Sequence, residues 1–215
     1  MEKELIISQT EKFVYEQLHD DSSGHDWWHI YRVTKVAKAL ALKENANMFI
    51  CEMAAFLHDV ADEKLNASEE EGINKVREFL LSIKVGEDYI SAIMEIITTM
   101  SFKGGGRPPM KTLEGMIVQD ADRLDAIGAI GIARTFAYSG TKNQLIYHPK
   151  IKPEEKLDPT QYRKRETTAI NHFHEKLFKL KDTMNTKMAK DMAESRHQYM
   201  EEYLETFLKE WGGDL

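Results

Sequence analysis

Apolar residues recur every three or four positions along almost the whole chain, which is the period of an amphipathic helix. The pattern predicts helices over residues 4–18, 26–44, 48–60, 69–83, 87–100 and 113–138, then two long helices over about 161–181 and 185–211. Asp26, Asn47 and Ser68 stand where side-chain N-caps are expected. No stretch shows the sustained alternation of a strand, so the sequence predicts an all-α protein, a compact helical bundle with C-terminal helices.

Two stretches break the helical pattern. Residues 101–111 (SFKGGGRPPMK) are rich in glycine and proline, and residues 138–160 form a long, polar, proline-punctuated segment. A loop of the second length is unusual in a compact domain, and it is either a surface connection or a lid over a site. The chain of 215 residues otherwise suits a single domain over residues 1–215.

Charge and composition narrow the class of protein. The net charge is −7, so no overall basic field would attract nucleic acid or an anionic membrane, and we expect neither as a partner. No run of residues is long and apolar enough for a membrane span, and the N-terminus lacks the apolar block of a signal peptide. Cys51 stands alone, which fits a reducing compartment and a cytoplasmic location. A homodimer is left open.

Several ionisable residues fall on helix faces that the pattern directs toward the core. His29 shares its face with Val33 and Leu40, and His58 follows a buried run at helical spacing with Asp59 beside it. Asp122 lies on the inward face of a later helix. An unpaired buried carboxylate is very costly, so the group suggests a shared cation, although each histidine alone could be an ordinary core residue. Imidazole and carboxylate ligands suit Mn, Mg, Co, Ni, Fe or Zn.

The same residues carry a family resemblance. His29 in HIYRV, His58 and Asp59 in AAFLHDV, and Asp122 in DADRLDAIGAIGIAR resemble the HD-domain phosphohydrolase superfamily in order and helical setting. With HFHEKLFKLKDTMNT downstream, the chain resembles a bacterial branch of stand-alone HD hydrolases. The resemblance implies a metal-site core over about residues 22–138, C-terminal helices over about 161–211, and one divalent metal ion.

The resemblance also implies the ligands, which would be His29, His58, Asp59 and one late aspartate. Asp120 and Asp122 lie about 200° apart on a helix, so one cannot replace the other. Both the family pattern, in which a basic residue follows the ligand, and the analysis of helix faces favour Asp122. Asp120 would then support the site or cap the helix.

The implied activity is a metal-dependent phosphohydrolase acting on phosphate esters or anhydrides, in which a metal-activated water attacks phosphorus. A nucleotide is the favoured substrate, with pyrophosphate release from nucleoside or deoxynucleoside triphosphates ahead of nucleotide monophosphatase or phosphodiesterase activity. A non-catalytic nucleotide sensor or scaffold with a structural metal is the alternative of another class. The chain has no histidine between His58 and His148 and no Gly-Tyr-Pro motif, which disfavours a two-metal oxygenase and a cyclic phosphodiesterase.

Other charged residues near the motifs are candidates for proton transfer and phosphate binding. Asp62 would lie on the face of His58 if the helix continued, and it is the candidate acid or base, with Glu63 as its rival. Arg123, Lys64, Arg32 and His25 are the candidate phosphate-binding residues. The alternative for each is a solvated surface charge.

Overall fold

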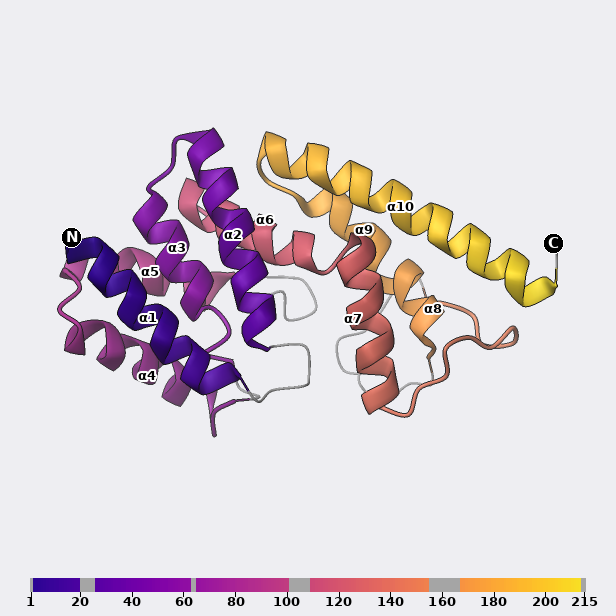
Figure 1. The fold of residues 1–215 in the computed structure, drawn as a ribbon, viewed down its shortest axis with the longest axis horizontal. Helices are drawn as coiled ribbons and strands as arrows, with labels where there is room; N and C mark the ends of the chain where they lie inside the picture. Colours follow the sequence, from indigo (N-terminus) through magenta and orange to yellow (C-terminus); the bar gives the residue numbers. More distant parts are fainter. Residues whose placement is uncertain (1, 20–25, 63–64, 101–108, 155–166, 214–215) are drawn as a thin grey trace. The chain divides into compact units, whose positions relative to one another are not determined.

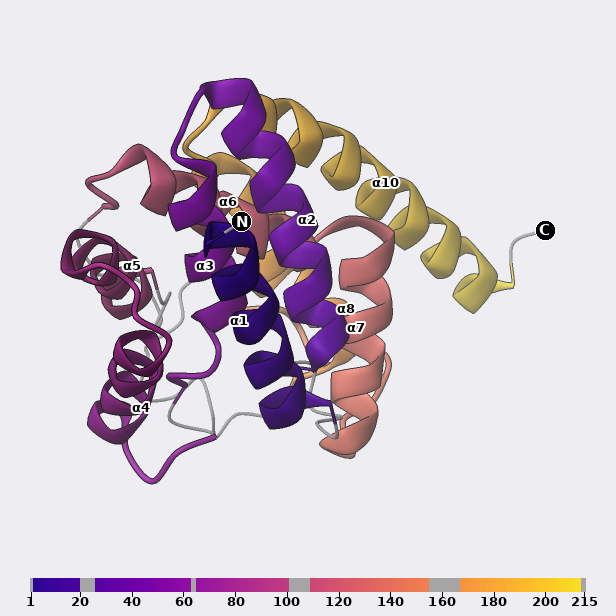
Figure 2. The same ribbon diagram turned by 60° about the vertical axis from the view of Figure 1, so that its left-hand side comes forward.

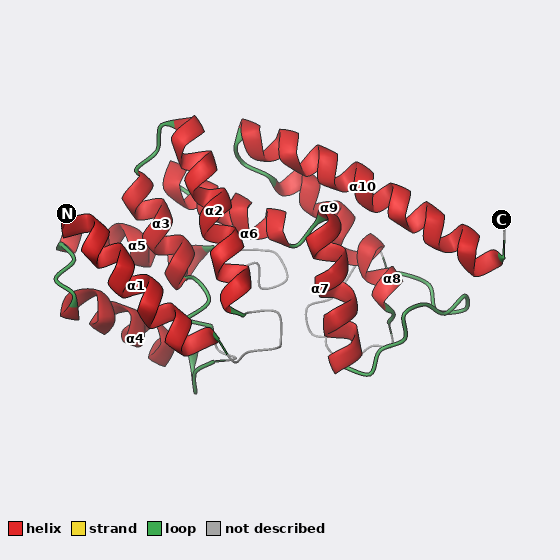
Figure 3. Cartoon of the chain, in the orientation of Figure 1, coloured by secondary structure: helices red, strands yellow, loops and turns green. Residues whose placement is uncertain are grey.

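The computed structural model of the chain describes residues 2–19, 26–62, 65–100, 109–154 and 167–213. Within these ranges the chain is built from helices and connecting segments without a strand, as Figure 3 shows, so the prediction of an all-α protein is confirmed. The chain divides into two compact units, Met1–Asp122 and Arg123–Leu215. The boundary lies inside helix α6, and the prediction of one domain over residues 1–215 stays a prediction.

Among the residues that the structure describes, the first unit contains five complete helices and most of a sixth. These are α1 (Glu2–Leu18), α2 (Trp27–Glu44), α3 (Met48–Leu57), α4 (Glu69–Ser82), α5 (Glu87–Thr99) and the greater part of α6 (Leu113–Asp125). Helix α3 contacts α1, α2 and α5 and is the most central helix of this unit (Figures 1 and 2). Every residue from Cys51 to Leu57 is buried. The unit therefore packs around α3, and the His-Asp pair follows directly at the end of that helix.

Three predicted N-caps begin three of these helices. The side chain of Asp26 accepts a hydrogen bond from the amide of His29, that of Asn47 from Ile50, and that of Ser68 from Glu71. Each cap satisfies one of the amide groups that a helix leaves unpaired at its N-terminus. The starts of α2, α3 and α4 are thus encoded locally.

The second unit begins with the end of α6 and continues through α7 (Gly128–Thr141), α8 (Ala169–His172), a π-helical turn (Phe173–Leu177), α9 (Phe178–Leu180), a 3-10 turn (Lys181–Thr183) and α10 (Lys187–Gly212). Helix α7 packs against α8 and α10. No helix among the described residues has the length and apolar character needed to cross a bilayer.

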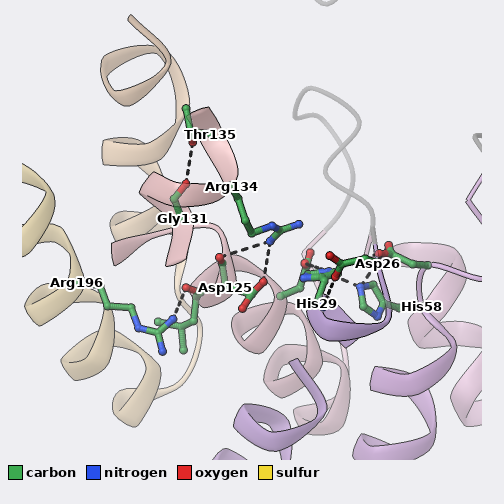
Figure 4. A network of polar contacts seen from close by, with 11 residues as sticks. Asp26, His29, His58, Asp125, Gly131, Arg134, Thr135 and Arg196 are labelled. Carbon is green, nitrogen blue, oxygen red and sulfur yellow. Dashed lines mark hydrogen bonds and ion pairs between the residues drawn. The ribbon is translucent and has the colours of Figure 1, made fainter. Parts of the chain in front are cut away.

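The single helix expected over residues 113–138 is wrong, because α6 ends at Asp125 and α7 begins at Gly128. Gly128 has a φ of +75°, a backbone conformation that residues other than glycine rarely adopt. The buried carboxylate of Asp125 receives a hydrogen bond from Arg134 at 2.8 Å, which ties α6 to α7 across the break (Figure 4). The apolar periodicity continues through the break, so it gave no sign of the interruption.

The other boundaries also differ in places. The helix expected over residues 48–60 ends at Leu57, and the part of the expected 161–181 helix that is described begins at Ala169 and includes the π-helical and 3-10 turns. Helix α7 extends to Thr141, and residues 142–154 have turns but no helix. The remainder of the long loop and residues 101–108 lie outside the described residues. The lid function therefore stays a prediction.

Candidate metal centre

Helix α2 places His29 in its first turn. The carboxylate of Asp26 accepts the amide hydrogen of His29 at 2.7 Å, which fixes the start of the helix one turn before the imidazole (Figure 4). The side chain of His29 is almost fully buried. Beside it, Trp27 stacks on Phe56 of α3, with the ring planes inclined by 8°. The N-terminal turn of α2 is thereby held against the last turn of α3.

A second contact joins the same two helices. Lys38 of α2 lies 2.5 Å from the carboxylate of Glu52 on α3, and Glu52 is buried. A buried carboxylate needs such a partner, so this ion pair constrains how α2 and α3 pack. The helices that carry His29 and lead to His58 are consequently fixed relative to each other by an aromatic stack and an ion pair.

His58 follows the last residue of α3, and its ring is oriented by the helix itself. Its Nδ1 lies 2.8 Å from the carbonyl oxygen of Ala55. A carbonyl can only accept, so Nδ1 carries a proton, and in the neutral ring Nε2 then has the lone pair. Nε2 is buried and makes no hydrogen bond to any of the described residues. A buried imidazole nitrogen in this state is prepared to bind a cation, and the carbonyl fixes its tautomer as the supporting group of a metal ligand does.

Two carboxylates lie beside the two imidazoles. Asp59 is 3.4 Å from Nε2 of His29 through one oxygen and 3.3 Å from Nε2 of His58 through the other. Asp122 Oδ1 is 3.4 Å from Nε2 of His29 and 3.9 Å from Nε2 of His58. Ligand atoms of His29, His58 and Asp59 all lie within 4.8 Å of one another. Atoms bonded to one ion at about 2.0–2.2 Å are separated by about 3 Å when adjacent, so the spacing fits a shared divalent cation.

The two late aspartates have different surroundings. Asp120 is fully buried, whereas the side chain of Asp122 is 40% exposed, so the prediction that Asp122 faces the core was only partly correct. Burial and the neighbouring Asp59 carboxylate tend to raise the pKa of Asp122, but the hydrogen bond from His29 and the positive charge that the two imidazoles carry when protonated outweigh them and lower the pKa. Asp122 is therefore held as a carboxylate beside the imidazoles, and it is the most exposed of the four side chains.

The structure describes only some of the candidate residues for proton transfer and phosphate binding. The helix does not continue through Asp62; the chain makes successive turns with hydrogen bonds from Val60 to Leu57 and from Asp62 to Asp59, so the helical phase used to choose Asp62 does not apply. Arg32 lies on α2 and is partly buried. Lys64, His25 and Glu63 lie outside the described residues. The roles of all these residues stay predictions.

Arg123 has a partner that its sequence context did not suggest. Its guanidinium donates a hydrogen bond to the carbonyl oxygen of Thr183, in the 3-10 turn of the second unit. This contact gives Arg123 a structural task within that unit. Its proposed contact with substrate phosphate stays a prediction beside it.

Comparison with known proteins identifies the family. Residues 27–127 match the HD domain. An HD-superfamily hydrolase from Bacillus thuringiensis is 50% identical, covers 98% of both chains and superposes with a TM-score of 0.79. A protein of known structure from Lactobacillus plantarum is 43% identical over the full length of both chains, with a TM-score of 0.84.

The chain belongs to the HD superfamily. The matched range contains all four residues of the centre, and HD domains bind divalent metal ions. Another relative is YpgQ of Bacillus subtilis, an uncharacterized protein that is 39% identical over 207 residues, covering 95% of this chain and 93% of YpgQ. YpgQ has been crystallised in complex with ADP, and that structure gives a TM-score of 0.77 at 37% identity, covering 95% of this chain and 97% of YpgQ.

If the four side chains form one metal site, removing one carboxylate should abolish metal binding. We predict that Asp59→Ala lowers bound Mn²⁺ or Co²⁺ to background and abolishes hydrolytic activity at the same time, because Asp59 lies within 3.4 Å of both imidazoles. The measurement is metal content after dialysis, by mass spectrometry. Asp88→Ala, at an exposed aspartate of α5, is the matched control and should keep the metal. Full metal occupancy in Asp59→Ala would show that Asp59 is not a ligand of the centre.

Proposed function

We propose that the protein is a metal-dependent phosphohydrolase that acts on nucleotides, with His29, His58, Asp59 and Asp122 holding one divalent ion. The observation that carries the proposal is the buried Nε2 of His58, which lies 3.3 Å from Asp59 and 3.9 Å from Asp122 and has no hydrogen-bond partner among the described residues. Packing alone gives no reason for this arrangement. A bound cation satisfies the nitrogen and both carboxylates together.

The chemistry that such an ion supplies is a bound water of lowered pKa and stabilisation of charge on phosphate oxygens. The protein's own residues set the geometry around it. The carbonyl of Ala55 keeps the His58 proton on Nδ1, and the cap at Asp26 fixes the first turn of α2. Asp122, which is partly exposed, leaves a side of the centre through which substrate can approach. Asp62 is the proposed group that accepts or returns a proton during hydrolysis.

The proposal of a nucleotide substrate is supported by the similarity of this chain to YpgQ. YpgQ, which aligns with nearly the whole of this chain, has been crystallised with ADP. We propose nucleoside or deoxynucleoside triphosphates as substrates and pyrophosphate as the leaving product, with Arg123, Lys64, Arg32 and His25 as phosphate-binding residues.

The direct test is hydrolysis of a panel of nucleoside and deoxynucleoside triphosphates with Mn²⁺, Mg²⁺, Co²⁺ or Ni²⁺ in ¹⁸O-labelled water. We predict a nucleoside monophosphate and pyrophosphate, separated by anion-exchange chromatography. The label will appear in the monophosphate if water attacks the α-phosphorus and in pyrophosphate if it attacks the β-phosphorus. Release of inorganic phosphate would instead indicate a phosphatase. No turnover with any metal, despite tight nucleotide binding, would favour a sensor or scaffold.

A second prediction separates proton transfer from metal binding. Asp62→Ala should keep its metal and lose about 10²–10⁴-fold in turnover, which is the usual cost of losing an acid or base group. Steady-state kinetics are compared with bound metal measured on the same sample. Glu63→Ala is the companion variant, and it should remain close to the unchanged protein. If Asp62→Ala is fully active and Glu63→Ala is not, the role belongs to Glu63.

A further inference from the structure

The segment that follows the His-Asp pair is fastened by the side chain of Asn66. Its amide nitrogen donates hydrogen bonds to the carbonyl oxygens of Val60, at 2.8 Å, and Asp62, at 2.9 Å. An amide nitrogen carries two protons, so these two carbonyls account for both of them. Val60 directly follows Asp59 in the chain. The amide of Asn66 therefore fixes the backbone immediately after a carboxylate of the metal centre.

The other backbone hydrogen bonds given for the described residues of this segment join residues three apart. After α3 ends at Leu57, the amide of Val60 bonds to the carbonyl of Leu57 at 3.1 Å, that of Asp62 to the carbonyl of Asp59 at 3.0 Å, and that of Leu65 to the carbonyl of Asp62 at 3.0 Å. These are isolated turns between residues three apart, which are weaker than a continuous α-helical ladder. Asn66 supplies the cross-link that a continuing helix would have supplied through its backbone.

Helix α4 closes the segment from the other side at Gly72. A Cβ added to Gly72 would lie 2.6 Å from the carbonyl oxygen of Ala61 and 2.7 Å from the amide nitrogen of Asn66. A side-chain carbon essentially never approaches an oxygen or nitrogen atom this closely, so only glycine lets α4 lie so near the turn. The backbone of α4 at Gly72 therefore lies directly against both the turn and the side-chain amide of Asn66.

We propose that Asn66 is a positioning residue for the metal centre. By holding the carbonyls of Val60 and Asp62, it keeps the Asp59 carboxylate where it lies 3.3–3.4 Å from the imidazoles of His29 and His58. The proposal rests on the proposed function only in that the centre must bind a divalent cation. Asn66 itself contacts neither the imidazoles nor the carboxylate side chains in any hydrogen bond of the structure.

The test compares the Mn²⁺ dissociation constants of Asn66→Ala and Asn66→Asp with that of the unchanged protein. Each constant is measured from the electron paramagnetic resonance signal of free Mn²⁺. Asn66→Ala should weaken Mn²⁺ binding by about 10–100-fold, the range found when the support of a metal ligand is lost. Its turnover should recover largely at saturating Mn²⁺, because the ligands themselves remain. Asn66→Ser, which keeps one donor, replaces the alanine variant if that variant melts below the assay temperature.

The Asn66→Asp variant distinguishes a positioning role of Asn66 from a purely electrostatic effect on the bound cation. The carboxylate has nearly the same shape, but it cannot donate to two carbonyls and repels them. A negative charge near a cation would tighten binding if charge alone mattered, whereas lost positioning weakens it. We expect Asn66→Asp to bind Mn²⁺ at least 10-fold more weakly. Asn74→Asp and Asn74→Ala, at an exposed position of α4, are the matched controls and should bind normally.

The outcomes are distinguishable. If Asn66→Ala and Asn66→Asp both bind Mn²⁺ as tightly as the unchanged protein does, the positioning role is wrong and the metal-dependent function stands. The same conclusion follows if Asn66→Asp binds Mn²⁺ more tightly than the unchanged protein. If the unchanged protein binds no divalent metal, the metal centre and the positioning role fall together. Thermal melting of each variant without metal shows whether a weaker dissociation constant reflects the centre or general unfolding.

Discussion

The site depends on the burial of two imidazoles and the carboxylate of Asp59 in the interior of the first unit, with a second carboxylate, Asp122, at its edge. Carboxylates removed from water are costly unless opposite charge or hydrogen bonds compensate them, and two of them also repel each other. Imidazoles compensate fully only when protonated, yet the proton of His58 lies on Nδ1, directed at the carbonyl of Ala55. A divalent cation, as proposed above, would resolve these conflicts in one step, and the need for such compensation constrains how the first unit is arranged.

The end of α3 lies at this group. Residues Cys51–Leu57 are buried, α3 contacts α1, α2 and α5, and the residues directly after the helix, His58 and Asp59, lie beside His29. The chain then leaves through isolated turns. A support outside the helix is needed there, and Asn66 and Gly72 provide it. The stacking of Trp27 on Phe56 and the Lys38–Glu52 pair perform the corresponding task between α2 and α3.

Much of this was predictable from the sequence, for physical reasons. Apolar periodicity locates helices and their faces, and short-range caps such as Asp26 and Ser68 mark their starts, because both depend on neighbouring residues. The convergence of His29, His58 and Asp59 followed from faces and a family resemblance. The break after Asp125 did not, since it depends on a left-handed Gly128 and on a pair with Arg134 that periodicity does not record.

Contacts between residues far apart in the chain were the least predictable. The hydrogen bond from Arg123 to Thr183 and the approach of Gly72 to Ala61 arise only after the helices have packed. The degree of exposure of Asp122 belongs to the same class, because a helix face shows direction but not what covers it. Asn66 lies close in sequence to the centre, yet an asparagine in a polar segment is too common to signal a structural bond.

The most direct measurement is a crystal structure of the protein grown or soaked with Mn²⁺, with diffraction collected on both sides of the manganese absorption edge. The account predicts one anomalous peak, with Nε2 of His29, Nε2 of His58 and oxygens of Asp59 and Asp122 within about 2.0–2.4 Å of it. An anomalous peak elsewhere, or a manganese ion from which Asp122 or either imidazole is absent, would contradict the account.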